Sequence, residues 1–233
     1  MRRITIAFVI VSLMTAGLTA PTWAKCAPPR TNDFVTHRWA GWENAANSSI
    51  AGVQSKIFNY DPYVKPNTDF AMAWVMLTNP SRTSYAQVGW IEHPYDARYT
   101  FFEYTYGIFN LWARAESAAL PEGTSSVYRV DYEFDGSNHW YHFWAGGQDL
   151  FRRNSNFDAA IGQIYGETLS AATQMPGATQ VPEVFDNAWR KVNGVWYSFD
   201  GTMVRSGPSA TTYFGATKVY STKATVWDKA CTT

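Results

Sequence analysis

The chain has 233 residues and carries 19 basic and 19 acidic side chains, so its formal net charge is zero. A chain without an excess of basic residues has no positive field to attract nucleic acid, which excludes that class of partner. Charged residues make up 16% of the sequence and aromatic residues 17%. This balance predicts an aromatic surface or cleft in addition to an aromatic core.

The first 24 residues have the pattern of a secretory signal peptide. Two arginines precede an apolar run from Ile4 to about Leu18, and small residues follow as far as Ala24. This run is short for a membrane anchor, and no second long apolar run follows it. We therefore expect residues 25–233 to form one secreted, monomeric domain without a membrane anchor.

The two cysteines, Cys26 and Cys231, lie at the two ends of the expected mature chain. In an oxidising compartment the simplest interpretation is a disulfide that joins the termini. The alternative is two free thiols in the terminal segments. If the cysteines pair, no thiol remains to bind a metal or to act as a nucleophile.

Short alternating runs, separated by turn residues, predict strands along the rest of the chain. Turn signals are strongest at residues 135–138 (DGSN), Asn193-Gly194 and Asp200-Gly201. Residues 111–119 could form one short helix. The expected strands are residues 34–39, 49–58, 71–77, 84–92, 98–106, 126–134, 139–145, 160–169, 195–199 and 212–220. This pattern predicts an all-β fold, an antiparallel sandwich or jelly roll of the concanavalin-A type.

The residues that usually bind metals or cofactors are poorly arranged in this sequence. His139 and His142 lie three residues apart on an expected strand and so face opposite sides of the sheet. No glycine-rich loop precedes a helix, and no G-x-S-x-G turn is present. We therefore expect no metal and no cofactor.

Carboxylates and amides on aromatic strands remain as the candidate chemistry. Gln87, Glu103 and Glu167 each lie within an expected strand. Strand alternation places Gln87 on the same face as Tyr85, and Glu167 on the same face as Tyr165. A polar residue in the middle of a strand needs solvent or a hydrogen-bond partner. Several such residues on one concave sheet face would form a polar cleft.

Two segments resemble signatures of the neprosin family. Residues 86–107, AQVGWIEHPYDARYTFFEYTYG, resemble a strand that contains glutamate or glutamine, a proline–tyrosine turn and an aromatic strand. Residues 165–177, YGETLSAATQMPG, resemble the second signature, a strand ending in glutamate followed by a loop. The runs AWVMLT and QVGW are also similar to the eqolisins, the fungal glutamic peptidases. The resemblance covers roughly residues 70–200.

This resemblance implies a β-sandwich that hydrolyses polypeptides without a metal, at acidic pH. Gln87 matches the position of the first catalytic residue and Glu167 that of the catalytic glutamate. Glu167 would be the general base, and Gln87 would orient water or stabilise the oxyanion. The neighbouring aromatic and polar residues are the candidate substrate contacts: Trp90, Glu103, Tyr85, Tyr165 and Gln174.

Two other functions fit the same residues. A non-catalytic module could bind glycan or peptide on the aromatic face, because many Trp and Tyr residues and few charges suit stacking on sugars. A glycosidase could use Glu103 and Glu167 if their carboxyls lie roughly 5–10 Å apart. Gln87 also has a purely structural interpretation, as a strand glutamine bonded to a neighbour.

Overall fold

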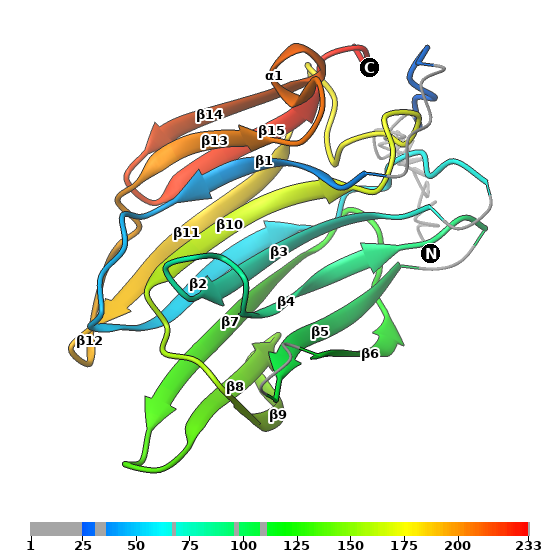
Figure 1. Ribbon diagram of the computed structural model, residues 1–233. Coiled ribbons are helices and arrows are strands. Elements are labelled where there is room, and N and C mark those ends of the chain that lie inside the picture. Colours follow the sequence, from blue (N-terminus) through cyan, green and yellow to red (C-terminus); the bar gives the residue numbers. More distant parts are fainter. Residues whose placement is uncertain (1–24, 31–35, 67–68, 96–97, 108–110, 233) are drawn as a thin grey trace, which may run out of the picture.

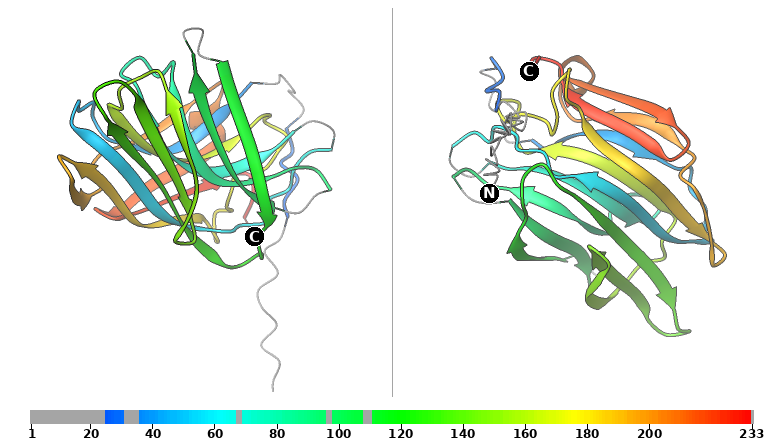
Figure 2. Two further views of the ribbon diagram at one scale, coloured as in Figure 1. Left: turned by 90° about the horizontal axis from the view of Figure 1, so that it is seen from below. Right: turned by 180° about the vertical axis from the view of Figure 1, so that it is seen from behind.

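The computed structural model describes residues 25–30, 36–66, 69–95, 98–107 and 111–232, so the expected signal peptide lies outside the described residues. In these ranges the chain forms two antiparallel β-sheets, which make two layers (Figures 1 and 2). A single short helix, α1 (Ala210–Tyr213), is described beside them. No helix in the described ranges is long and apolar enough to cross a membrane. The predicted all-β fold class is confirmed.

Each sheet combines strands that are far apart in the sequence. Sheet A has the order β13 (Thr202–Ser206), β1 (Arg38–Glu43), β10 (Ile161–Thr168), β3 (Ala71–Thr78), β4 (Tyr85–Glu92), β5 (Arg98–Tyr106) and β6 (Leu111–Ala119). Sheet B has the order β14 (Phe214–Tyr220), β15 (Lys223–Asp228), β11 (Glu183–Val192), β2 (Ile50–Phe58), β7 (Ser125–Phe134), β8 (His139–Ala145) and β9 (Gln148–Ser155). The eighth strand of sheet B, β12 (Val195–Ser198), pairs with β11.

Strand alternation creates two apolar layers. The main core lies between the sheets and includes Val75 and Val88 from sheet A with Val53 and Phe143 from sheet B. A second buried cluster lies on the outer face of sheet A and consists of Phe70, Met72, Trp74, Ile91, Phe101 and Tyr165. Because β3 is apolar on both faces, polar side chains on the outer face of sheet A lie next to a buried apolar layer.

The sequence pattern located most strands, but residues 111–119 form β6 and not the expected short helix. β6 pairs with β5, so its backbone hydrogen bonds come from a neighbouring strand, whereas an isolated nine-residue helix is marginal in water. β9, β11, β13 and β15 were not predicted. In β11 a register shift between Asp186 and Trp189, with Asn187 at φ 48°, interrupts the alternation.

The predicted disulfide is present. Cys26 and Cys231 are bonded, with their Cα atoms 5.7 Å apart, and they are separated by 205 residues in the sequence. The backbone N–H of Cys26 also donates to Oε1 of Gln174 over 3.0 Å. The bridge therefore joins the start of the described domain to its end.

Replacement of both cysteines, Cys26→Ser with Cys231→Ser, should lower the free energy of unfolding by up to about 5 kcal/mol. The reason is that the unfolded chain regains the entropy removed by closing a very long loop. Denaturant titration of the variant and of the oxidised wild type measures this loss. The reduced wild type, which also lacks the bridge, is the matched control and should show a similar loss. An unchanged midpoint in both samples would contradict the prediction.

Candidate functional site

Gln87 and Glu103 face each other across the pairing of β4 with β5. The side-chain amide of Gln87 donates to Oε1 of Glu103 over 3.3 Å, and the hydroxyl of Tyr85 donates to the same oxygen over 2.5 Å. Gln87 is buried, whereas Glu103 and Tyr85 are half-buried. One carboxylate oxygen therefore fixes the orientation of the amide. We call these three residues the amide cluster.

Glu167 is held by two partners on the same outer face. Its Oε1 lies 2.5 Å from Nδ1 of His37, and its Oε2 accepts a hydrogen bond from Nε1 of Trp74 over 2.8 Å. Gly89 lies opposite Trp74 across β3 and β4. A Cβ atom at Gly89 would lie 2.0 Å from the carbonyl oxygen of Ala73, so only glycine allows this close approach. We call Glu167, His37 and Trp74 the histidine cluster.

The pairing of β4 and β10 with β3 brings Gln87 and Glu167 to one face of sheet A, but they do not lie in the same row. Gln87 pairs with Met76 of β3 and Glu167 with Met72, four residues away on that strand. On a flat sheet this register separates the Cα atoms of Gln87 and Glu167 by about 16 Å. Among the described residues no hydrogen bond links the two side chains, and Glu103 is the carboxylate that contacts Gln87.

The charges of the two clusters nevertheless influence each other. Burial raises the pKa of Glu103, and the charge of Glu167 contributes to the rise, against the hydrogen bond from Tyr85 and the charge of Arg114. The hydrogen bond to Glu167 raises the pKa of His37, and the charge of Glu103 acts in the same direction. The two clusters therefore form one electrostatically coupled site.

A third carboxylate, Glu43, ends β1 on the same face. It accepts hydrogen bonds from Gln163 over 2.8 Å and from Tyr165 over 3.0 Å, and Arg82 pairs with it at 2.7 Å. Burial opposes ionisation of Glu43, but these three partners outweigh it and lower its pKa. The ring of Tyr165 also packs against Trp74, with 5.1 Å between centroids. Tyr165 is thus buried beneath the site and does not line its surface.

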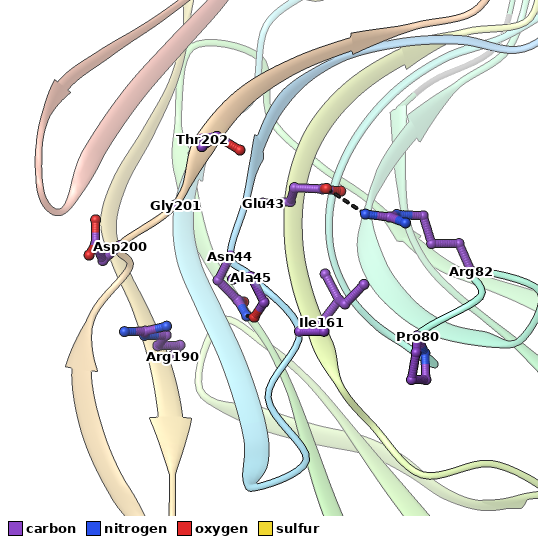
Figure 3. A pocket seen from close by; sticks show the side chains of 11 residues that line it. Glu43, Asn44, Ala45, Pro80, Arg82, Ile161, Arg190, Asp200, Gly201 and Thr202 are labelled. Carbon is purple, nitrogen blue, oxygen red and sulfur yellow. Dashed lines mark hydrogen bonds and ion pairs between the residues drawn. The ribbon is translucent and has the colours of Figure 1, made fainter.

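A cavity of about 580 Å³ opens beside Glu43 and Arg82. Figure 3 shows this ion pair on one side of the cavity and Arg190 and Asp200, from the region of β11 and β12, on the other. Ile161, the first residue of β10, also lines the cavity, whereas Glu167 lies near the other end of that strand. The cavity is therefore separate from the histidine cluster.

Two expected substrate contacts do not reach this face. Trp90 is fully buried in the core between the sheets, where its Nε1 donates to the carbonyl of Phe58 over 3.0 Å. Alternation along β4 turns Trp90 to the face opposite that of Gln87.

Gln174 is also fully buried, and its Oε1 accepts hydrogen bonds from the backbone of Cys26 and of Tyr63. Both residues have structural roles, which corrects the expectation for them.

Sequence reasoning missed His37 and Trp74. His37 directly precedes β1, and β1 pairs with β10, the strand that carries Glu167. This pairing joins segments about 130 residues apart, so no local pattern indicated it. Among the described residues, no group of three His, Cys, Asp or Glu side chains is arranged to hold a metal ion.

Comparison with solved structures finds glutamic peptidases. Scytalido-glutamic peptidase with a peptide-based transition-state analogue has a TM-score of 0.61 and 13% identity, covering 84% of this chain and all of that chain. SCP-B, a member of the eqolisin family of peptidases in complex with the tripeptide Ala-Ile-His, has a TM-score of 0.61 and 12% identity, with the same coverage.

The chain shares the fold of the glutamic peptidases. The similarity to the eqolisins predicted from the sequence is confirmed at this level. No family model and no curated protein matches the chain. Membership of the neprosin family therefore stays a prediction.

Replacement of Trp74 by phenylalanine removes the indole N–H that binds Glu167. Trp74→Phe should lower the free energy of unfolding by about 2–3 kcal/mol, because a buried hydrogen bond to a carboxylate is lost. Denaturant titration measures the change. The control is Trp112→Phe, at a side chain that is 62% exposed, which should change stability by less than about 0.5 kcal/mol. Equal effects of the two substitutions would contradict the assignment.

Two more carboxyls, Glu92 and Glu183, are buried near Arg98. Burial raises the pKa of Glu92 to about 7, although Arg98 lies 3.3 Å away. Burial raises the pKa of Glu183 well above its ordinary value. The folded state therefore keeps protons that the unfolded chain loses at about pH 4.3. The stability that these groups contribute is present below that pH and is lost as the pH rises towards the folded-state pKa.

Glu183→Gln removes this titration, so the variant should gain stability relative to the wild type as the pH rises from about 4 to 8. Unfolding free energies measured across that range test the sign. Glu133→Gln, at a side chain that is 62% exposed, is the control and should show no such trend. A difference that shrinks with rising pH would refute the assignment.

Proposed function

We propose that this protein is a secreted, metal-independent endopeptidase of the glutamic type that hydrolyses polypeptides at acidic pH. The observation that carries the proposal is the placement of Gln87, Glu103 and Glu167 on one sheet face, where a hydrogen bond joins Gln87 to Glu103 and charge couples Glu103 to Glu167. The fold supports it, because the two similar structures described above are peptidases and one of them holds a peptide-based transition-state analogue.

Glu167 would act as the general base. Its two oxygens are fixed by His37 and Trp74, so the carboxylate is held in a defined orientation for a water molecule. The water would lose a proton to Glu167 and attack the carbonyl carbon of the peptide bond. No covalent intermediate with the enzyme is needed in this scheme.

Gln87 would stabilise the oxyanion. A primary amide has two N–H donors, and the bond to Glu103 uses one of them. The second N–H is then available for the oxygen of the tetrahedral intermediate. Glu103 would position this amide, and Tyr85 would hold Glu103 in turn. Burial and Glu103 raise the pKa of Tyr85 well above its ordinary value, so its hydroxyl stays a donor throughout the acidic range.

The substrate would bridge the two clusters. Their separation along the strands suits an extended chain, which rises about 3.3 Å per residue. Trp112 lies on the same face, because it pairs with Thr105 of β5, and it is 62% exposed. Its ring could pack against an apolar side chain of the substrate.

Digestion of a denatured protein from about pH 3 to pH 7, read by mass spectrometry, tests this function. Glu167→Gln should abolish cleavage because the base is lost. Gln87→Ala should lower kcat by roughly 10²–10³ because one oxyanion donor is lost. Glu103→Gln should lower kcat less, because an amide can still accept the hydrogen bond from Gln87. A chelator should have no effect on any of these rates.

Glu133→Gln is the matched control for the carboxylate substitutions and should retain full activity, since its side chain is 62% exposed on β7 of sheet B. If Glu103→Gln abolished cleavage while Glu167→Gln did not, the base would be Glu103. If the folded wild type cleaved nothing at any pH, the proposal would fail, and binding of glycans and peptides would be the function to measure next.

A further inference from the structure

His37 occupies the solvent side of the carboxylate of Glu167. The side chain of His37 is 54% exposed and that of Glu167 only 6%, although Nδ1 and Oε1 lie 2.5 Å apart. Trp74, which holds the other oxygen, is buried. A substrate that approaches Glu167 from solvent therefore meets the imidazole first.

The surroundings of His37 favour its protonated form. Three carboxylates act on it from different elements: Glu167 of β10, Glu103 of β5 and Asp69, which precedes β3. Their combined effect exceeds the opposing effect of partial burial, so the pKa of His37 is raised. The edge of the ring also contacts Phe70, with 5.6 Å between centroids, which restricts its rotation. The imidazole is thus held in place by Glu167 and Phe70, and the surrounding carboxylates favour its charged form.

One nitrogen of this ring is available for chemistry. Nδ1 is occupied by Glu167, and within the described residues no hydrogen bond involves Nε2. In the proposed hydrolysis the leaving nitrogen must receive a proton before or as the C–N bond breaks. An imidazolium N–H beside the base is suited to supply it.

We propose that His37 is the general acid of this site and protonates the leaving nitrogen from Nε2. The inference rests on the proposed function. The water proton passes to Glu167 as the water oxygen bonds to the carbonyl carbon, and the carbonyl electrons move to the oxygen near Gln87. When the intermediate collapses, the C–N bond breaks and its nitrogen takes the proton of His37. The carboxyl proton of Glu167 then returns to the exposed imidazole through solvent, so each cycle consumes one water and releases one acid and one amine.

Leaving-group dependence tests this role. A general acid matters for an amine, which must be protonated to leave, and matters little for the stable anion released by an activated ester. His37→Gln should therefore lower kcat/KM for a peptide substrate by roughly 10²–10⁴, and for a nitrophenyl ester of the same acyl peptide by less than about tenfold. The fall in peptide hydrolysis above the pKa of His37 should also disappear in the variant. Equal losses on both substrates, or no loss on the peptide, would overturn the proposal.

His93→Gln is the matched control. His93 also pairs with a carboxylate, since its Nε2 lies 3.1 Å from Oε1 of Glu116, but it belongs to neither cluster. This variant should keep the wild-type ratio of peptide to ester hydrolysis. A change of that ratio comparable to the effect of His37→Gln would also overturn the proposal.

A second measurement is independent of activity. NMR titration of the His37 ring should give a lower pKa in Glu167→Gln than in the wild type, because the neighbouring negative charge is removed. An unchanged pKa would refute the pairing on which the inference depends. If the pKa of His37 differs between the wild type and Glu167→Gln but the wild type hydrolyses no peptide, the proposed function is refuted, and this acid role with it. An active enzyme that tolerates His37→Gln would refute the acid role alone.

Discussion

β3 is apolar on both faces, and the chemistry of the outer surface depends on that constraint. Its inward side chains, such as Val75, fill the core, and its outward side chains, such as Trp74, form a second buried layer. Carboxylates that project from this layer lose part of their hydration, so their ionisation depends on the partners they find. A strand with a solvated outer face would leave the same carboxylates with ordinary properties.

The contrast between Glu43 and Glu103 shows that the partners of a carboxylate determine the direction in which its pKa shifts. Both lie on the outer face of sheet A, and burial opposes ionisation of both. Glu43 has Arg82 at 2.7 Å together with two neutral donors, and its pKa is lowered. Glu103 has Tyr85 and the amide of Gln87 as its direct hydrogen-bond donors, and its pKa is raised. One surface thus carries carboxyls with opposite shifts, an arrangement common where acid and base chemistry occur together.

Alternation along single strands could be predicted from the sequence, and the register between strands could not. Period-two patterning correctly placed Gln87 on the same face as Tyr85, and Glu167 on the same face as Tyr165, since facing within one strand depends only on neighbours in the chain. That Gln87, Glu103 and Glu167 share one face of the sheet follows only from the pairing of their strands. Their positions relative to one another depend on β3 pairing with both β4 and β10, and β10 comes about 90 residues after β3. The contact between His37 and Glu167 depends on the same long-range pairing. Trp90 was assigned to the site because of its place in the motif, although its parity along β4 directs it to the core.

The two clusters are held by different strands, and this separation bears on how the site works. β5 orients Gln87 through Glu103, whereas β3 and the residue before β1 orient Glu167. No hydrogen bond of the described residues crosses between Gln87 and Glu167, so their coupling is electrostatic and reaches through Glu103. Each cluster is therefore held by its own hydrogen bonds, and in the proposed function a bound peptide would connect them. In the proposed hydrolysis, binding energy from an extended chain would contribute directly to aligning Glu167 with Gln87.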